Sequence, residues 1–213
     1  MIELVAFLGN PGREYAHTRH NAGRMLAERL SFFPSLHWRN TYKGLYASIT
    51  GNRLLPGDGC NGTGPCEKAL PPTLHFLMPE TYMNRSGESV AAAASFFKIP
   101  PDRILLVHDE LELSLGQAAL KFSGGLGGHN GLRSMRACFN TPDFWRMRIG
   151  IGRPGHDDIS GWVLSDFTLA ERPLMEQALN ACADALLRAL IQGPQSLLPE
   201  WNKKNIPDAG EKP

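Results

Sequence analysis

The chain has few cysteines and no long apolar run. Its four cysteines in 213 residues are too widely spread to form a disulfide scaffold. Cys60 and Cys66 are separated by five residues, against roughly two to four in zinc knuckles, and no histidine pair completes a site. No apolar run approaches the length of a membrane span, and the N-terminus lacks the basic and small-residue regions of a secretory signal. These absences predict a reduced, cytoplasmic protein that binds neither membrane nor metal.

The chain also has almost no net charge, because 22 Lys and Arg oppose 21 Asp and Glu. A net charge of +1 neither requires nor excludes a nucleic-acid partner. Residues 116–153 are locally basic, with one acidic side chain, Asp143, against six basic ones: Lys121, Arg133, Arg136, Arg146, Arg148 and Arg153. This segment is either a docking surface for a phosphate backbone or a solvated basic face.

Alternating apolar segments indicate the fold class. Short, nearly continuous apolar runs predict strands at residues 2–8, 42–49, 74–78, 103–107 and 145–151. Apolar residues three and four apart predict helices at 22–33, at 86–97 with Ser86 as a cap, after the glycine-rich segment 124–131, and at 174–191. Strands that alternate with helices predict an α/β fold with one twisted, mixed and mostly parallel sheet covered by helices.

The length and the 42% of hydrophobic residues favour a single catalytic domain over residues 1–205. Within it, residues 51–72 are rich in Gly and Pro and carry Cys60 and Cys66, which predicts a surface-loop insertion. The polar residues 206–213 are expected to form a flexible tail.

Two residues form a candidate acid–base pair. His20 follows the turn that ends the first predicted strand, and Asp109 lies at the carboxyl end of the strand predicted at 103–107, where α/β sheets place ligand sites. A histidine is a natural general base, and a carboxylate bonded to one ring nitrogen leaves the other free to activate water. The alternatives are a structural histidine and a carboxylate that caps nearby backbone.

Three asparagines, Asn10, Asn84 and Asn130, lie in separate turn or glycine-rich segments. A carboxamide both donates and accepts hydrogen bonds, so it can hold a peptide backbone, water or an oxyanion, although asparagine also favours turns for conformational reasons. Tyr15 and Tyr82 are suited either to stacking on a base or to core packing.

Several common active-site motifs are absent. The glycine-rich segment 124–128 does not fit G-x-G-x-x-G, because Asn130 stands at the sixth position counted from Gly125, and no Gly-Lys-Ser/Thr follows. The chain also lacks G-x-S-x-G and H-E-x-x-H, which weakens serine-hydrolase and zinc-protease alternatives. The glycines instead allow backbone to approach a substrate and lead into a helix N-terminus.

Five motifs occur in order along the chain, and together they resemble the bacterial-type peptidyl-tRNA hydrolase family. They are Leu8-Gly9-Asn10-Pro11-Gly12 with Tyr15 and Thr18-Arg19-His20-Asn21, residues 79–87 around Tyr82-Met83-Asn84, Val107-His108-Asp109-Glu110-Leu111, Gly127-Gly128-His129-Asn130-Gly131-Leu132, and residues 148–154.

The resemblance implies hydrolysis of the ester between a peptide and the 3′ ribose of tRNA, without metal or cofactor, by a monomer. It implies that His20 activates water, that Asp109 keeps His20 basic, and that Asn10 distinguishes a blocked peptidyl group from a free aminoacyl group. The resemblance further implies contact with the substrate near the tRNA 3′ end by Tyr15, Tyr82, Asn84 and Asn130. It also implies that Met83 and His129 line the cleft and that Lys121 and Arg148 clamp phosphate.

The sequence departs from the family pattern at two positions. Ala119 stands where many members carry a second basic residue, which is expected to weaken tRNA affinity modestly, and Glu112 replaces the more usual Asp. Two alternatives stay open, a non-catalytic RNA-binding relative of the intron-splicing-cofactor kind and a metal-dependent peptidase.

Overall fold

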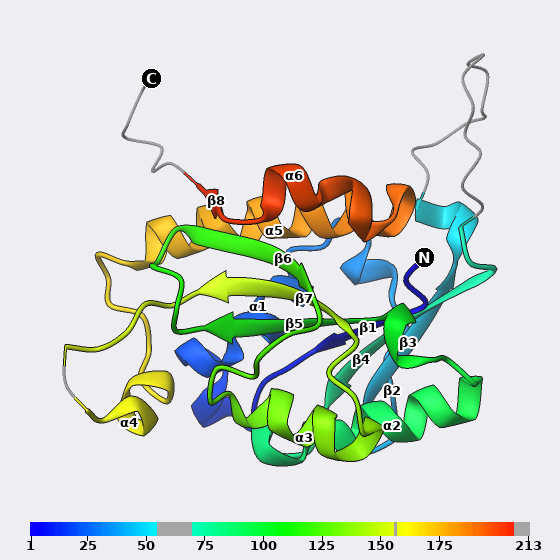
Figure 1. Cartoon of the computed structure of the whole chain (residues 1–213), viewed down its shortest axis with the longest axis horizontal. Helices are drawn as coiled ribbons and strands as arrows, with labels where there is room; N and C mark the ends of the chain where they lie inside the picture. Colours follow the sequence, from blue (N-terminus) through cyan, green and yellow to red (C-terminus); the bar gives the residue numbers. More distant parts are fainter. Residues whose placement is uncertain (55–69, 156, 207–213) are drawn as a thin grey trace.

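One mixed sheet forms the centre of the computed structural model, which describes residues 1–54, 70–155 and 157–206. Its strands lie in the order β2-β3-β4-β1-β5-β7-β6-β8 (Figure 1). Their bounds are β1 Leu4–Phe7, β2 Arg39–Thr41, β3 Gly44–Thr50, β4 Thr73–Pro79, β5 Ile104–Glu110, β6 Gln117–Phe122, β7 Trp145–Gly150 and β8 Lys204–Asn205. The pairs β4-β1, β1-β5 and β5-β7 are parallel, and the flanking pairs are antiparallel. The predicted mixed α/β sheet is confirmed, with its parallel pairs at the centre, but the sheet is not mostly parallel, because three described pairs are parallel and four are antiparallel.

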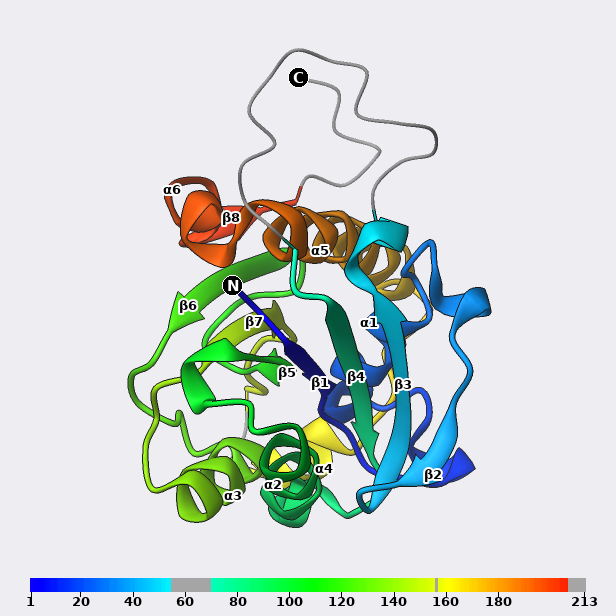
Figure 2. The ribbon, with the colours of Figure 1, turned by 90° about the vertical axis from the view of Figure 1, so that its right-hand side faces the viewer.

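The central strands are apolar on both faces because both faces are covered. In β1, Val5 and Phe7 join one hydrophobic core, whereas Leu4 and Ala6 join the other. Figure 2 shows the sheet between a layer containing α1, α5 and α6 and a layer containing α2 and α3. Burial on both faces explains the nearly continuous apolar run of this strand.

The helices are α1 Ala22–Ala27, α2 Ser86–Phe97, α3 Asn130–Phe139, α4 Ile159–Val163, α5 Arg172–Gln192 and α6 Leu198–Trp201. Short 3-10 turns connect the elements: η1 Arg13–Tyr15, η2 Arg19–Asn21, η3 Phe33–Ser35, η4 Gly51–Leu54, η5 Met83–Arg85, η6 Pro101–Arg103 and η7 Pro194–Leu197. Among the described residues, no helix is both long and apolar enough to span a bilayer.

Two predictions about the helices were wrong. The helix expected at 22–33 ends at Ala27, after which Leu30 and Phe33 donate backbone hydrogen bonds three residues back, as in 3-10 turns. Both side chains still pack on the core, so apolar residues three apart can face the core without forming an α-helix. Ser86 does not cap α2: it is the first helical residue, and its hydroxyl points to the Met83 sulfur at 3.9 Å.

Strands β2 and β6 were not predicted, whereas β4 and β7 lie within one residue of their predicted bounds. The surface loop proposed at 51–72, with Cys60 and Cys66, lies mostly outside the described residues, as does the tail proposed at 206–213. The free Cys182 is buried in α5, as its place in the apolar stripe predicted.

The parallel arrangement brings three chain segments to one edge of the sheet. The carboxyl ends of β1, β4 and β5 lead to Asn10, to η5 and to Asp109 respectively. Polar residues that are far apart in the sequence therefore meet where these strands end.

Candidate active site

A cleft of about 590 Å³ lies at this edge of the sheet. One side of the cleft is lined by Asn10, His20, Asp109 and His129, together with Tyr82, Met83, Asn84 and Asn130. Residues of α4 form another part of its wall. The structure thus gathers eight of the eleven predicted site residues around one cavity.

Asp109 joins two histidines at the cleft floor. The His20 Nδ1 atom lies 2.9 and 3.0 Å from the two carboxylate oxygens, and the His129 Nε2 atom lies 2.9 Å from Oδ1. Asp109 is 1% exposed and His20 is 7% exposed. With Nδ1 of His20 bonded to the carboxylate, its Nε2 atom is the nitrogen available to the cleft.

The tautomer of His129 follows from its second contact. Its Nδ1 atom accepts hydrogen bonds from the backbone N–H groups of Gly131 (3.1 Å) and Leu132 (3.3 Å), so the ring caps the start of α3. A nitrogen that accepts from two N–H groups carries a lone pair, so the ring proton is on Nε2 and is donated to Asp109.

Asp109 is held in its ionised form. Burial by itself would raise the pKa of this carboxyl, but the nearby charges and hydrogen bonds of His20 and His129 outweigh burial and hold the pKa well below its usual value. A permanently charged carboxylate stabilises the imidazolium that His20 becomes when it takes a proton.

Asn10 is fixed on both its backbone and its side chain. Its Oδ1 atom accepts a hydrogen bond from the Met83 backbone N–H at 2.8 Å, which leaves the amide NH2 group for the cleft. The Asn21 side chain accepts from the Asn10 backbone N–H at 2.8 Å and donates to its carbonyl at 3.0 Å. The carboxamide is therefore oriented before any substrate binds.

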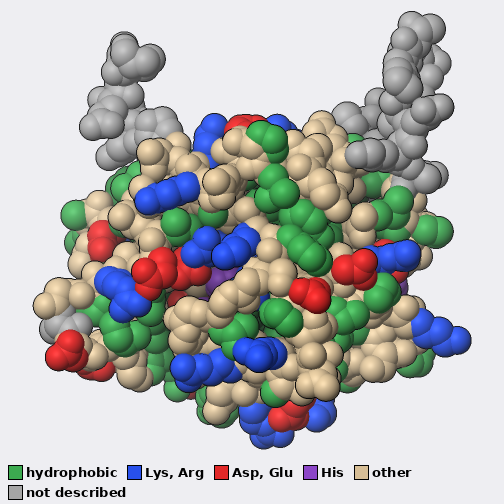
Figure 3. Space-filling model, viewed as in Figure 1, with side chains coloured by type: hydrophobic (Ala, Val, Ile, Leu, Met, Phe, Trp, Pro, Cys, Tyr) green, Lys and Arg blue, Asp and Glu red, His purple; other side chains and the backbone are tan. Residues whose placement is uncertain are grey.

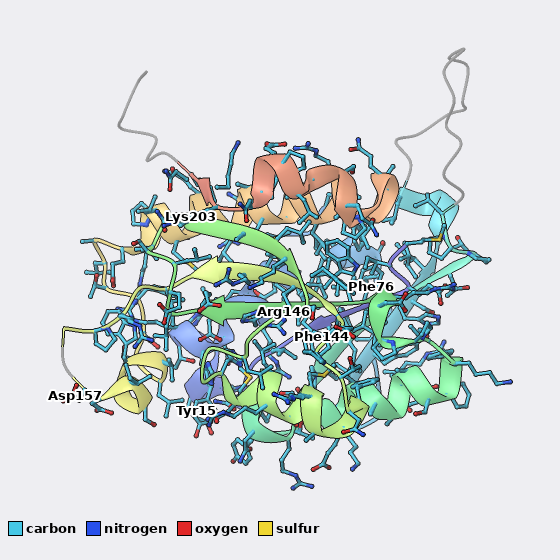
Figure 4. All side chains as sticks on the ribbon, in the orientation of Figure 1. Tyr15, Phe76, Phe144, Arg146, Asp157 and Lys203 are labelled. Carbon is cyan, nitrogen blue, oxygen red and sulfur yellow. The ribbon has the colours of Figure 1, made fainter. Side chains whose placement is uncertain are left out.

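The segment after β4 lies against the start of α3. A Cβ added to Gly131 would lie 2.7 Å from the Met83 sulfur, so a larger residue there would require the Met83 side chain to shift. Met83 is buried, whereas Tyr82 is 59% exposed and packs edge-on against Tyr15 with 6.4 Å between ring centroids. Figure 4 shows Tyr15 at the edge of the molecule, near α3 in that view. Tyr15 itself does not line the cavity.

The predicted phosphate clamp lies outside the cavity lining. Lys121 is exposed on β6, while the Arg148 Nε atom on β7 donates to the Glu110 carboxylate at 2.9 Å. Ala119 pairs with Arg148 in the sheet and is fully buried, so the position that differs from the family pattern lies beneath these side chains.

The basic segment is less uniformly positive than the sequence indicated. Arg148 pairs with Glu110 and Arg153 with Glu112, two acids just before the segment that was counted. Figure 3 shows basic and acidic side chains side by side across the middle of this face, with a histidine visible between them. Among the described residues no ion pair involves Lys121, Arg133 or Arg136, so these are the cations open to a phosphate backbone.

Arg146 is a buried support and not part of the surface. It is 2% exposed, it donates to the Gly125 and Gly124 carbonyls at 2.6 and 2.9 Å, and its guanidinium lies 4.9 Å from the Phe144 ring centroid (Figure 4). Burial and then the like charge of Arg148 lower its pKa to about 10, which leaves it charged at neutral pH. It anchors the glycine-rich segment that leads to His129.

Sequence reasoning also missed His108, which is fully buried behind His129 with 4.9 Å between ring centroids. Its Nδ1 atom lies 2.6 Å from the Asp109 carbonyl oxygen, and burial holds its pKa well below the usual value. A neutral ring there donates to that carbonyl and supports the segment that carries Asp109.

Comparison with known proteins decides the family. The family model described as peptidyl-tRNA hydrolase matches residues 4–209. The chain belongs to the peptidyl-tRNA hydrolase family. The peptidyl-tRNA hydrolase of Treponema pallidum (strain Nichols) is 43% identical over 212 residues, covering 96% of both chains. That of Azoarcus sp. (strain BH72) is 40% identical over 200 residues, covering 93% of this chain and 80% of its own.

The fold agrees with a solved member of the peptidyl-tRNA hydrolase family. The crystal structure of peptidyl-tRNA hydrolase from Acinetobacter baumannii superposes with a TM-score of 0.76 at 36% identity, covering 94% of this chain and 96% of the other. The family resemblance inferred from the five motifs is thereby confirmed.

Proposed function

We propose that this member of the peptidyl-tRNA hydrolase family cleaves the ester between a peptide and the tRNA 3′ ribose with water that His20 activates. The observation that carries this proposal is the bond between Nδ1 of His20 and the buried Asp109 carboxylate, which leaves Nε2 as a base facing the cleft. The family of its relatives and the fixed Asn10 carboxamide support the same reaction.

The proposed reaction proceeds in two steps. Nε2 of His20 takes a proton from water, and the water oxygen bonds to the ester carbonyl carbon to give a tetrahedral intermediate. The ester C–O bond then breaks, and the proton passes from His20 to the departing 3′ oxygen of the ribose. Asp109 stabilises the transient imidazolium, while amide groups such as that of Asn10 hold the peptide carbonyl.

The remaining site residues keep the roles that the sequence predicted for them. Contacts with the substrate near the tRNA 3′ end come from Tyr15, Tyr82, Asn84 and Asn130. Met83 and His129 line the cleft, and Lys121 contacts phosphate together with Arg148, which exchanges its ion pair with Glu110 to do so. We also propose a single catalytic domain over residues 1–205 that acts as a monomer in the cytoplasm.

Peptide release from a purified N-blocked aminoacyl-tRNA, measured beside the unblocked form, tests the proposal. His20→Ala is expected to abolish release without changing the far-UV circular dichroism spectrum, because the base is lost and the core is untouched. Near-normal turnover by this variant would contradict the mechanism. Equal rates on blocked and unblocked substrates would contradict the role of Asn10.

A metal-dependent peptidase is the second candidate, because donor atoms of His20, Asp109 and His129 lie within 4.8 Å of one another. The hydrogen bonds weigh against it: His129 would need a lone pair on Nε2, yet two backbone N–H groups already require the lone pair on Nδ1. We therefore expect full activity after dialysis against EDTA. Loss of activity that added Zn²⁺ restores would favour the peptidase.

The other alternative, a non-catalytic RNA-binding protein, is less favoured because its relatives are named as hydrolases and the base and its carboxylate are both in place. Tight binding of structured RNA without any peptide release would favour it.

A further inference from the structure

The wall of the cleft formed by α4 is attached to the rest of the molecule through partly buried side chains. Ile159, Ser160 and Val163 of α4 and Leu164 after it line the cavity. None of the five residues of α4 is fully buried, although Trp162 and Val163 pack against the hydrophobic core and the Trp162 Nε1 atom donates to the Gly152 carbonyl at 2.8 Å. Contacts at the rim of the core therefore help to hold this wall in place.

Arg19 supplies such a contact. Its guanidinium lies 3.8 Å from the ring centroid of Trp162 in α4 and 4.8 Å from that of Phe167. Its Nη2 atom lies 2.9 and 3.2 Å from the two carboxylate oxygens of Glu171. The side chain is 2% exposed, and its Nε and Nη1 atoms have no hydrogen-bond partner among the described residues. Aromatic faces and one carboxylate thus stabilise a buried cation, an arrangement that suits arginine better than lysine.

Arg19 is also the residue directly before His20 in η2. Its backbone N–H donates to the Ser165 carbonyl at 3.0 Å, and Thr18 forms a β-bridge with Asp166. The same short segment therefore carries the proposed base and holds the α4 wall.

We propose that Arg19 is a positioning residue. By stacking on Trp162 it holds α4 at the distance that sets the width of the cleft where the peptide part of the substrate binds. The inference rests on the function proposed above. The cleft-facing side chains of α4 are mainly apolar, whereas the unpaired cations Arg133 and Lys121 lie on α3 and β6. Phosphates need those cations, so the apolar α4 wall is the part suited to peptide side chains.

Steady-state kinetics on N-acetyl-dileucyl-tRNA and N-acetyl-glycyl-tRNA test the proposal. Arg19→Met and Trp162→Leu are each expected to raise KM for the leucine substrate roughly three- to tenfold, with kcat within about twofold and a smaller effect on the glycine substrate. The double variant should show little more than Trp162→Leu alone, because both changes remove the same stacking contact and Trp162→Leu also removes the hydrogen bond to the Gly152 carbonyl. Arg19→Lys keeps the charge beside Glu171 without the planar stack, so an intermediate KM is expected.

Arg29→Met is the matched control, since this arginine pairs with Glu176 of α5 at 3.7 Å, whereas Arg19 pairs with the α5 N-cap Glu171, and no ion pair or ring contact of Arg29 with α4 is found among the described residues. Its KM should not change. Amide hydrogen exchange of residues 158–166 should quicken in Arg19→Met while that of β1 and β5 does not.

Two results would overturn the role of Arg19: an unchanged KM in both Arg19→Met and Trp162→Leu, or a fall in kcat alone with a shifted pH profile. If Arg19→Met does not fold, Trp162→Leu decides the question, because no residue of α4 is fully buried. Failure of the wild-type chain to release peptide would instead refute the proposed function, so the two failures are distinguishable.

Discussion

At the scale of single residues, His129 connects chemistry with folding. The same ring donates to Asp109 through Nε2 and accepts the first free N–H groups of α3 through Nδ1. Its loss would remove a helix cap and one of the two donors that hold the Asp109 carboxylate. A suitable pair of substitutions separates these effects.

We expect His129→Ala to lower the free energy of unfolding by about 1 kcal/mol, the usual cost of losing an N-cap. His129→Asn should recover most of that loss, because asparagine caps helices well, but its shorter side chain should not restore the contact with Asp109. Urea unfolding measures the first effect and peptide release the second. Equal stability of the two variants would contradict the capping role, and full activity of His129→Asn would contradict the role at Asp109.

The sequence identified His20, Asp109 and the asparagines because their chemistry depends on residue type. It did not identify the partners of the charged residues, because pairing depends on the folded chain. Glu110 precedes the basic segment in sequence yet neutralises Arg148 across two strands, and Arg146 looks like a surface cation until the fold buries it.

At the scale of elements, apolar periodicity predicted α2, α5 and the central strands, where burial decides the pattern. It failed at the edges of the sheet. Tyr42 and Lys43 form the turn between β2 and β3, with φ 53° and 55°. Hairpin turns of this kind are usually marked by Asn-Gly, and these two residues do not provide that signal. β6 has exposed residues at its carboxyl end and contains Ala119 and Lys121, which do not suggest a buried strand.

Both α2 and α3 end at a residue in the left-handed backbone conformation, and the two residues differ in the free energy that this conformation costs. Lys98 has φ 57° and Asn140 has φ 58° at the respective helix ends. Because glycine adopts this conformation without the Cβ clash that lysine suffers, Lys98→Gly should raise the free energy of unfolding by about 1 kcal/mol. Asn140→Gly is the control and should gain less, since asparagine already tolerates the conformation. Urea unfolding distinguishes the two, and an equal gain would contradict the argument.

At the scale of the whole molecule, a net charge of +1 conceals an uneven distribution of usable cations. Lys121 on β6 and Arg136 on α3 form no ion pair among the residues described, whereas Arg188 pairs with Glu200 at 2.8 Å. A cation that contacts phosphate adds to the salt dependence of binding, because it releases condensed counterions.

Lys121→Gln and Arg136→Gln should therefore each reduce the slope of log affinity for tRNA against log salt by about 0.7–0.9. Arg188→Gln should leave the slope unchanged. Fluorescence titration with tRNA across a series of salt concentrations measures these slopes, and an unaltered slope in both test variants would show that the phosphates lie elsewhere.

The separation in sequence of the residues that complete the site has a consequence for the protein's own synthesis. His20 meets Asp109 across 89 residues, and Arg19 meets Glu171 across 152. An enzyme that cleaves peptidyl-tRNA is itself a peptidyl-tRNA until translation ends. Because contacts of this range form only after the later segments have emerged from the ribosome, we expect the nascent chain to lack the bond between His20 and Asp109 during most of its synthesis.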